Sequence, residues 1–324
     1  MKKFLKMVKI VFITVSLLLT AIISVSFLNH RFNLSKEKAL LIEPGEMVNI
    51  NNNNLHLYSE GQGNETLVFM AGGGTSAPML DFKSLYSLLS DKYKVAVVEK
   101  SGYGFSDNSN SSRDIDTILE ESRLALKKTE LNGPYILLAH SMSGIEALYW
   151  ASKYPEEVKA IIGLDMVVPE TYKDYSVNQL LVNLSAFGAR IGITRFIPKI
   201  VNDSAAIKNG NLSLEDKNLY KAIFYNKTMT KPMVKEVLKI KENADKVNDK
   251  HNIDTPLLFF ISNGKETGWD ETEWINYQVD YIKNSKNTMN KYIKYDVSHY
   301  IHNFVYKEIA EETINFIEEA INYK

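Results

Sequence analysis

Short apolar runs alternate with stretches of helical spacing over most of the chain beyond residue 45. The runs Met47–Ile50 and Leu55–Tyr58 flank an asparagine run, which predicts a hairpin with an asparagine-rich turn. Further apolar runs predict buried strands at Thr66–Ala71, Lys94–Glu99, Tyr135–Ala139, Val158–Leu164, Leu257–Ile261 and Lys291–Val297. Helices are predicted at 78–90, 114–130, 141–154, 270–283 and 304–321. This alternation is typical of an α/β protein whose mostly parallel sheet is covered by helices on both faces.

The alternation stops between Met166 and Ile253, where the pattern is helical and the joints are charged or rich in asparagine. We interpret this stretch as a helical cap inserted between the sixth and seventh strands. The body then consists of residues 46–165 and 254–324, with the cap at 166–253. Seven apolar residues of the cap either line a site for an apolar group or pack the cap onto the body: Leu180, Leu181, Leu184, Phe187, Ile191, Ile193 and Phe196.

The N-terminus has a different pattern, an uncharged run of 19 residues from Ile10 to Leu28. At about 1.5 Å per residue, a helix of this length just crosses a hydrocarbon core of about 30 Å. Four lysines precede the run, at Lys2, Lys3, Lys6 and Lys9. Residues 1–30 are therefore predicted to anchor the chain in a membrane, with the lysines in the cytoplasm and the body outside it.

A cleaved signal segment is the alternative to an anchor, because Ser24-Val25-Ser26 fits a cleavage site. In that case the body is secreted. Under either interpretation residues 31–45 are predicted to form a short polar stalk, and the folded body begins near residue 46.

Composition excludes several classes of function. The chain has 38 Lys and Arg against 39 Asp and Glu, a net charge of −1, so no broad basic surface for nucleic acid is expected. It has no Cys, which excludes disulfides, a thiolate nucleophile and Cys-ligated zinc. A hydrophobic fraction of 45% is sufficient for a large core.

The segment Ala139-His140-Ser141-Met142-Ser143-Gly144 joins a predicted buried strand to a predicted helix. A serine on such a sharp turn needs small residues two positions before and two positions after it, and Ala139 and Ser143 meet that need. Ser141 is therefore a candidate nucleophile. The alternative is an ordinary strand–helix joint in which the serine caps the helix.

From roughly residue 46 to 322 the sequence resembles the α/β-hydrolase superfamily. The segment around Ser141 is similar to the family's G-H-S-M-G-G elbow, with Ala139 and Ser143 in place of glycines. Residues 99–107 resemble its D-x-R-G-x-G-x-S segment, and residues 71–74 its H-G-G-G loop with alanine for histidine. The resemblance implies an α/β-hydrolase fold, a mostly parallel sheet flanked by helices and interrupted by the helical cap.

The same resemblance implies roles for other residues. The backbone N–H groups of Met142 and Gly73, with Gly74 as a second candidate, would form an oxyanion hole for the negative oxygen of a tetrahedral intermediate. Ser298-His299-Tyr300-Ile301-His302 resembles the family's G-H-x-x-H segment, in which the first histidine is the general base. His299 is thus the candidate base.

The acid that orients the base has more than one candidate. Glu266 follows the predicted strand Leu257–Ile261, near the position where the family usually has its aspartate. Asp165 follows the strand that ends at Leu164, and some lipase-like members use that position. Asp270 would serve if the loop after Ile261 is longer. These three alternatives remain open at the level of sequence.

Together these residues predict acyl transfer to water through an acyl-enzyme, with no metal or organic cofactor. A small-molecule or lipid-like carboxylic ester is the first choice of substrate, with an apolar acyl group. Amide or peptide hydrolysis and carbon–carbon bond hydrolysis on the same triad are alternatives. A second alternative is a non-catalytic, membrane-anchored binding module on a hydrolase fold.

Overall fold

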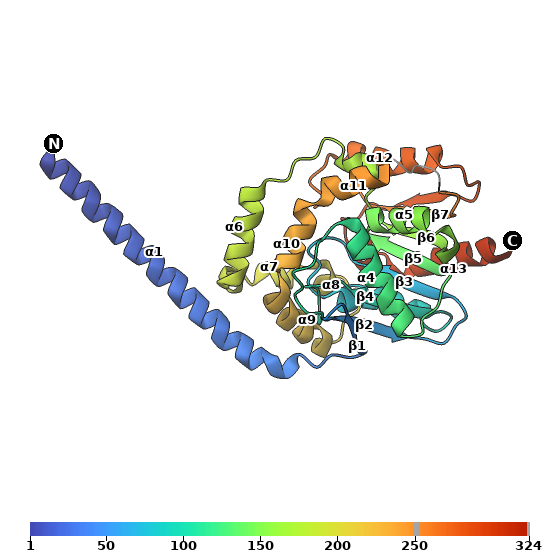
Figure 1. The fold of residues 1–324 in the computed structure, drawn as a ribbon, viewed down its shortest axis with the longest axis horizontal. Helices are drawn as coiled ribbons and strands as arrows, with labels where there is room; N and C mark the ends of the chain where they lie inside the picture. Colours follow the sequence, from blue (N-terminus) through green and yellow to red (C-terminus); the bar gives the residue numbers. More distant parts are fainter. Residues whose placement is uncertain (249–252, 323–324) are drawn as a thin grey trace.

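The computed structural model describes residues 1–248 and 253–322, and Figure 1 shows a rounded body from which one long helix projects. The body is built on a sheet in the order β1-β2-β4-β3-β5-β6-β7-β8. The strands are β1 (Glu46–Ile50), β2 (Asn53–Glu60), β3 (Thr66–Met70), β4 (Lys94–Glu99), β5 (Tyr135–His140), β6 (Val158–Leu164), β7 (Leu257–Ile261) and β8 (Lys291–Lys294). β2 is antiparallel to both β1 and β4, and every other pair is parallel. The predicted mostly parallel sheet is confirmed.

Helices cover both faces of this sheet, as predicted. One core cluster packs α4, α5 and α12 against it, and a second packs α3 and α13 against the other face. These helices are α3 (Lys83–Leu89), α4 (Ile115–Lys128), α5 (Ser143–Lys153), α12 (Glu271–Asn284) and α13 (Tyr306–Asn322). The helix predicted over 78–90 is in fact two, because α2 (Pro78–Asp81) ends at Phe82. The ring of Phe82 is fully buried against Phe69 and His302 at that joint.

Between β6 and β7 the chain is helical. The elements are the 3-10 turns η3 (Pro169–Tyr172) and η4 (Ile193–Phe196), and helices α6 (Gln179–Arg190), α7 (Lys199–Asn202), α8 (Ala205–Lys208), α9 (Leu214–Lys227), α10 (Lys231–Leu238) and α11 (Ile240–Asn248). Ile240, Ala244 and Val247 of α11 pack into the main core of the body, and the cap boundary at residue 253 stays a prediction. Residues 249–252 lie outside the described part of the chain.

The projecting element is α1 (Lys2–Glu37), which is long and apolar enough to cross a membrane and is largely exposed. Within the predicted stalk, 31–45, α1 continues to Glu37 and a 3-10 turn, η1 (Lys38–Leu40), follows. The helix persists because its last turns are held by the cap. The guanidinium of Arg195 in η4 forms two 2.7 Å hydrogen bonds with the Glu37 carboxylate and donates to Nδ1 of His30 at 2.9 Å.

Candidate active site

Ser141 lies in the turn between β5 and α5 and has a backbone φ of +54°. A positive φ is strained for a residue other than glycine, and it is typical of a serine held on a sharp strand-to-helix turn. The small neighbours serve this turn. Ala139 is fully buried, and the Ser143 hydroxyl donates to the carbonyl oxygens of Met70 and His140 at 2.6 and 2.8 Å. Ser143 thus also ties the turn to the end of β3.

The glycine loop after β3 passes directly against the serine. A Cβ on Gly72 would lie 2.7 Å from the Cβ of Ser141, closer than such atoms approach in proteins. Only glycine therefore lets the loop lie this close to the Ser141 side chain, which explains why a glycine run ends this strand.

His299 connects Ser141 to a carboxylate. Its Nε2 lies 2.8 Å from the Ser141 hydroxyl, and its Nδ1 lies 2.6 Å from an oxygen of Asp165. When Nδ1–H donates to Asp165, the neutral imidazole keeps Nε2 free to accept the hydroxyl proton. The structure thus brings together three residues from the loops after β5, β6 and β8, at the carboxyl ends of parallel strands.

Asp165 is fully buried at the end of β6, and other groups hold it in place. The hydroxyl and backbone N–H of Ser262 donate to its two oxygens at 2.6 and 2.8 Å, and the Trp274 indole N–H donates at 2.9 Å. Burial alone would raise the pKa of Asp165, but the hydrogen bonds and charge of His299 and the Ser262 bonds outweigh it and hold the pKa below its usual value. Asp165 is therefore ionised at neutral pH.

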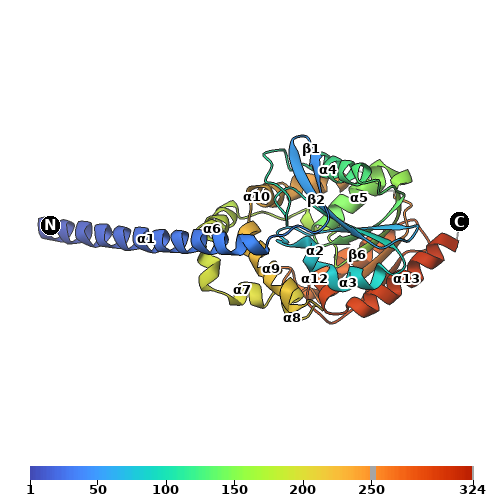
Figure 2. The same ribbon diagram turned by 90° about the horizontal axis from the view of Figure 1, so that it is seen from below.

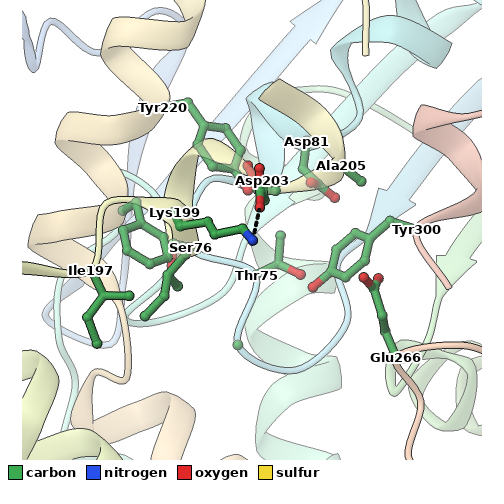
Figure 3. Close-up of a pocket in the computed structure, with 14 residues that line it drawn as sticks. Thr75, Ser76, Asp81, Ile197, Lys199, Asp203, Ala205, Tyr220, Glu266 and Tyr300 are labelled. Carbon is green, nitrogen blue, oxygen red and sulfur yellow. Dashed lines mark ion pairs between the residues drawn. The ribbon is translucent and has the colours of Figure 1, made fainter. Parts of the chain in front are cut away.

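Neither of the other candidate carboxylates reaches His299. Glu266 lies in a turn with φ +75°, and Figure 3 shows it beside Tyr300 at the wall of a cavity. No hydrogen bond joins Glu266 to His299 in the described structure, where Nδ1 is occupied by Asp165. Asp270 caps α12 by accepting the N–H groups of Thr272 and Glu273. Glu266 and Asp270 were the alternatives to Asp165, and in the structure neither is the partner of His299.

Backbone N–H groups of two neighbouring residues are the candidates for an oxyanion hole. Gly73 and Met142 line the same cavity as Ser141, and within the described residues neither N–H has a protein hydrogen-bond acceptor. Gly74 is different, because its N–H donates to the phenolic oxygen of Tyr103 at 3.3 Å. Of the two glycines expected to supply a donor, Gly73 is therefore the one left available.

Two adjoining cavities meet at this site. The first has a volume of about 250 Å³ and contains Ser141 and His299 in its wall. The second, shown in Figure 3, measures about 500 Å³ and extends from Gly74 to the cap segment around Lys199. Both are lined by Glu266 and Tyr300, so the cavities touch along one wall. The serine is accessible from a space that the cap covers.

His140, the histidine of the elbow, is buried beside His299. Nε2 of His140 donates to the carbonyl oxygen of His299 at 3.3 Å. Burial, with the charges of His302 and His299, lowers the pKa of His140 far below its usual value. His140 is therefore neutral at physiological pH and supports the backbone of His299. His302 instead contacts the carboxylate of Asp81 at 2.8 Å.

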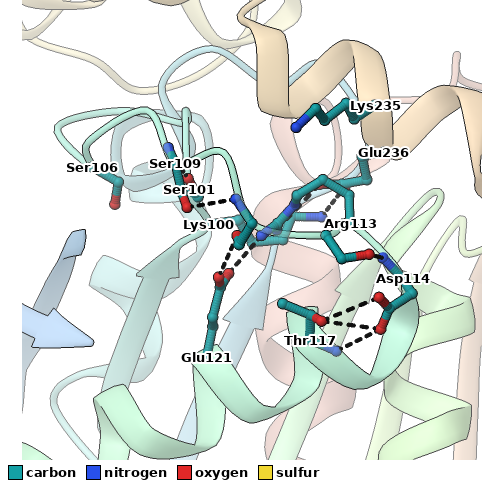
Figure 4. A network of polar contacts seen from close by, with 12 residues as sticks. Lys100, Ser101, Ser106, Ser109, Arg113, Asp114, Thr117, Glu121, Lys235 and Glu236 are labelled. Carbon is teal, nitrogen blue, oxygen red and sulfur yellow. Dashed lines mark hydrogen bonds and ion pairs between the residues drawn. The ribbon is translucent and has the colours of Figure 1, made fainter. Parts of the chain in front are cut away.

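A buried charge cluster joins the cap to the body beside the site. Glu236 of α10 pairs with Lys100 and Arg113 of the loops after β4, and Figure 4 shows these three side chains converging. All three are almost completely buried. The hydroxyl of Tyr103 donates to Glu236 at 3.0 Å and accepts from Gly74 N–H, so the cluster extends to the glycine loop. Nothing in the sequence pattern pointed to Tyr103, Trp274 or Ser262.

Within the described residues, no group of three or more His, Asp or Glu side chains is arranged to hold a metal ion. The polar groups around Ser141 are instead engaged with one another, in a chain of hydrogen bonds from Asp165 to the serine hydroxyl.

Comparisons with known proteins identify the family of this chain. A family model described as the alpha/beta hydrolase fold matches residues 65–182. The protein YbdG of Bacillus subtilis (strain 168), itself uncharacterized, is 42% identical over 262 residues, which cover 80% of this chain and 81% of that protein. The chain belongs to the α/β-hydrolase superfamily.

Solved structures of other α/β-hydrolases share the fold. A lipase proposed in Acinetobacter baumannii AYE superposes with a TM-score of 0.63 at 15% identity, covering 91% of this chain and 97% of that chain. An epoxide hydrolase of Bacillus megaterium superposes with a TM-score of 0.64 at 17% identity, covering 84% and 100%. At these identities the likeness concerns the fold alone, because this fold hosts different reactions.

Proposed function

We propose that this α/β-hydrolase is a serine hydrolase that cleaves a carboxylic ester through an acyl-enzyme intermediate. The observation that carries the proposal is the relay of hydrogen bonds from Asp165 through His299 to Ser141. This arrangement has the geometry that activates a serine for attack on a carbonyl carbon.

In this mechanism His299 accepts the Ser141 proton as the hydroxyl oxygen attacks the ester carbonyl. Asp165 stabilises the imidazolium that forms, without taking the proton itself. The N–H groups of Met142 and Gly73 donate to the negative oxygen of the tetrahedral intermediate. His299 then gives the proton to the leaving alcohol as the ester C–O bond breaks. In the second half of the reaction it takes a proton from the water that attacks the acyl-enzyme, and it returns that proton to the Ser141 oxygen as the bond to the acyl group breaks and the acid leaves.

The residue at the elbow supports acyl transfer over the other reactions that this fold hosts. Epoxide and haloalkane hydrolysis in this superfamily use a carboxylate nucleophile, whereas this position holds Ser141. Amide and carbon–carbon bond hydrolysis would use the same three side chains, and an ester is the less demanding acyl donor. A non-catalytic binding module would have no need for a buried, ionised Asp165 bonded to His299.

We further propose that α1 is a retained anchor, with the body on the outer side of the membrane. Cleavage at Ser24-Val25-Ser26 would remove Ser26, yet this residue is buried and its hydroxyl donates to the carbonyl oxygen of Ile191 at 2.7 Å. The helix also continues through this position without a break. If Ser26 stays in contact with Ile191, the apolar residues that precede Ser26 in α1 are retained as well.

Labelling with a fluorophosphonate tests the serine. The full chain in detergent should gain one adduct on Ser141, located by tandem mass spectrometry, and Ser141→Ala and His299→Ala should abolish it. Ser143→Ala is the matched control and should retain the adduct, since the Ser143 hydroxyl donates to Met70 and not to His299. Absence of the adduct on a folded wild-type chain would refute the hydrolase proposal.

Substitution of the carboxylates tests the relay. Asp165→Asn should lower ester turnover by about 10⁴-fold, because the histidine loses the partner that fixes its tautomer. Glu266→Gln should change it by no more than a few-fold. Comparable losses in both variants would argue against Asp165 as the acid.

A further inference from the structure

The outer surface of the cap is unusually apolar. Beyond residue 42, thirteen large apolar side chains of the described chain are exposed, and eight of them lie within 180–200. They are Leu180, Leu181, Leu184, Phe187, Ile193, Phe196, Ile197 and Ile200. We call this set the outer cap face. Leu180, for example, is 70% exposed. Soluble surfaces rarely gather apolar side chains in this way without a partner.

The outer cap face has the pattern of a surface helix with its apolar side outward. Leu180, Leu184 and Phe187 of α6 follow at intervals of four and three residues, which places them on one side of the helix. Their exposure shows that this side points away from the body. The expectation that these residues pack the cap onto the body is therefore wrong for most of them, although Ile191 is buried.

The position of α1 indicates what covers this face. Ser26 donates to the carbonyl of Ile191, and a Cβ on Gly192, which has φ +80°, would lie 2.4 Å from the Cβ of His30. The turn between α6 and η4 is thus pressed against the end of the apolar run that finishes at Leu28. Figures 1 and 2 both show one end of α6 beside this part of α1.

The contact between α1 and the turn at Ile191 indicates how deep the outer cap face lies relative to the membrane. When α1 spans a bilayer, Leu28 lies near the membrane surface, because polar residues follow it. The turn at Ile191 is then at the same level, and the outer cap face extends from it. Between residues 175 and 202 the sequence has three basic residues and no acidic residue. Arg195 pairs with Glu37 and Lys199 with Asp203, whereas Arg190 is exposed at the end of α6. A segment of this composition suits the interface of a bilayer that contains anionic lipid.

We propose that the outer cap face docks on the bilayer in which α1 is anchored. Arg195 makes the junction stiff, since it pairs with Glu37 and lies over the Tyr225 ring at 4.1 Å from its centroid. Ile197 and Ile200 of this face also line the 500 Å³ cavity that adjoins the Ser141 cavity. Docking therefore brings one wall of this cavity against the lipid phase, next to the cavity of the serine, which makes an acyl lipid the class of substrate. The choice of an acyl lipid as substrate rests on the proposed hydrolase function, whereas the docking of the outer cap face does not.

Site-specific fluorescence tests the docking. The chain has no Cys, so single variants Leu184→Cys and Phe187→Cys accept one environment-sensitive NBD label each. The full chain is placed in phosphatidylcholine–phosphatidylglycerol vesicles, with and without doxyl-labelled lipid as a quencher. Leu88→Cys, an exposed apolar position on α3 of the body, is the matched control, and Leu19→Cys within α1 is the positive control.

Several-fold stronger lipid quenching at 184 and 187 than at 88 supports the docking. Quenching at 184 no greater than at 88 would overturn it. A blue-shifted label that lipid does not quench would also overturn it, since a second copy of the chain would then cover the face. No quenching at 19 would place α1 outside the bilayer and remove the basis of the proposal.

A second measurement separates docking from catalysis. The double variant Leu184→Glu/Phe187→Glu should lose several-fold in turnover of an ester embedded in vesicles and keep its turnover of a soluble short-chain ester. Leu88→Glu should change neither. Equal turnover of the embedded ester by wild type and double variant would refute lipid delivery. Lipid quenching at 184 in a chain that takes up no fluorophosphonate would instead support docking and refute the hydrolase proposal.

Discussion

The inner and outer faces of the cap have opposite chemistry. Inside, Glu236 of α10 is buried in an ion cluster with Lys100 and Arg113. Outside, α6 exposes Leu184 and Phe187 to the surroundings. In a protein surrounded by water on all sides the reverse is expected, with charges outside and leucines inside. The contrast indicates that the two faces meet different environments, and that the inner charges fix the position of the cap while the outer leucines have another partner.

The largest expected effect comes from breaking the inner face. Glu236→Ala removes the carboxylate that joins the cap to the cluster and accepts from Tyr103. Lys100 keeps Glu146 and Arg113 keeps Glu121, so the loss should be about 1–3 kcal/mol of unfolding free energy. Chemical denaturation of the full chain in detergent measures it. Glu242→Ala on α11 is the matched control, because the exposed pair of Glu242 with Lys239 contributes at most about 1 kcal/mol. Similar losses in the two variants would contradict the buried cluster.

The pH dependence of stability sharpens the same contrast. Burial opposes the charge on Lys100, but Glu146 and Glu236 outweigh it and raise the pKa of Lys100. The folded chain then holds a proton that the unfolded chain releases at the usual lysine pKa of about 10.4, so stability falls as pH rises above that value, by at most about 1.4 kcal/mol per unit. Lys100→Met should make the decline between pH 10 and 11.5 shallower in thermal unfolding. Lys199→Met, on the outer side, should leave the slope unchanged.

A smaller effect is expected at the link between the inner face and the site. Tyr103→Phe removes the hydroxyl that accepts from Gly74 N–H and donates to Glu236, at a cost of about 1 kcal/mol. Because the glycine loop also carries Gly73, ester turnover should fall several-fold while KM changes little. Steady-state kinetics measures this, with Tyr292→Phe at an exposed position as control. An unchanged kcat would show that the link does not position the loop.

The smallest effect is expected on the outer face in detergent. Leu184→Ser should change the unfolding free energy by less than about 0.5 kcal/mol, since Leu184 is 57% exposed. The same denaturation series measures it. A loss of about 2 kcal/mol or more would mean that Leu184 is packed, and the contrast between the two faces would disappear.

The local pattern of apolar and polar residues was sufficient to predict most strands of the sheet. The bounds predicted for β4, β6 and β7 agree with the structure, because each is a short apolar run bounded by polar or turn residues. The hairpin was also predictable, since Asn51 and Asn52 both take the positive φ that its two-residue turn requires and that asparagine tolerates. In these cases the information lies within a few neighbouring residues.

Long-range partners could not be read from the sequence. The polar residues after Leu28 remain helical because of Arg195, whose position in the cap depends on the whole fold. Likewise Glu266 and Asp165 both follow strands whose carboxyl ends lie at one edge, so spacing alone left both as partners of the histidine. The choice depends on the position of Nδ1 of His299, which Ser262 and Trp274 help to fix through Asp165.

The junction between α1 and the cap also has a consequence for the order in which the molecule is assembled. α1 is synthesised before the cap, since Arg195 follows Glu37 only after 158 residues. A contact that closes so long a loop forms late. Residues 26–37 therefore stay without their cap partners until β1–β6 have been made. As the retained anchor that we propose, α1 would enter its membrane before the cap exists, and the cap would then assemble against a helix that is already in place.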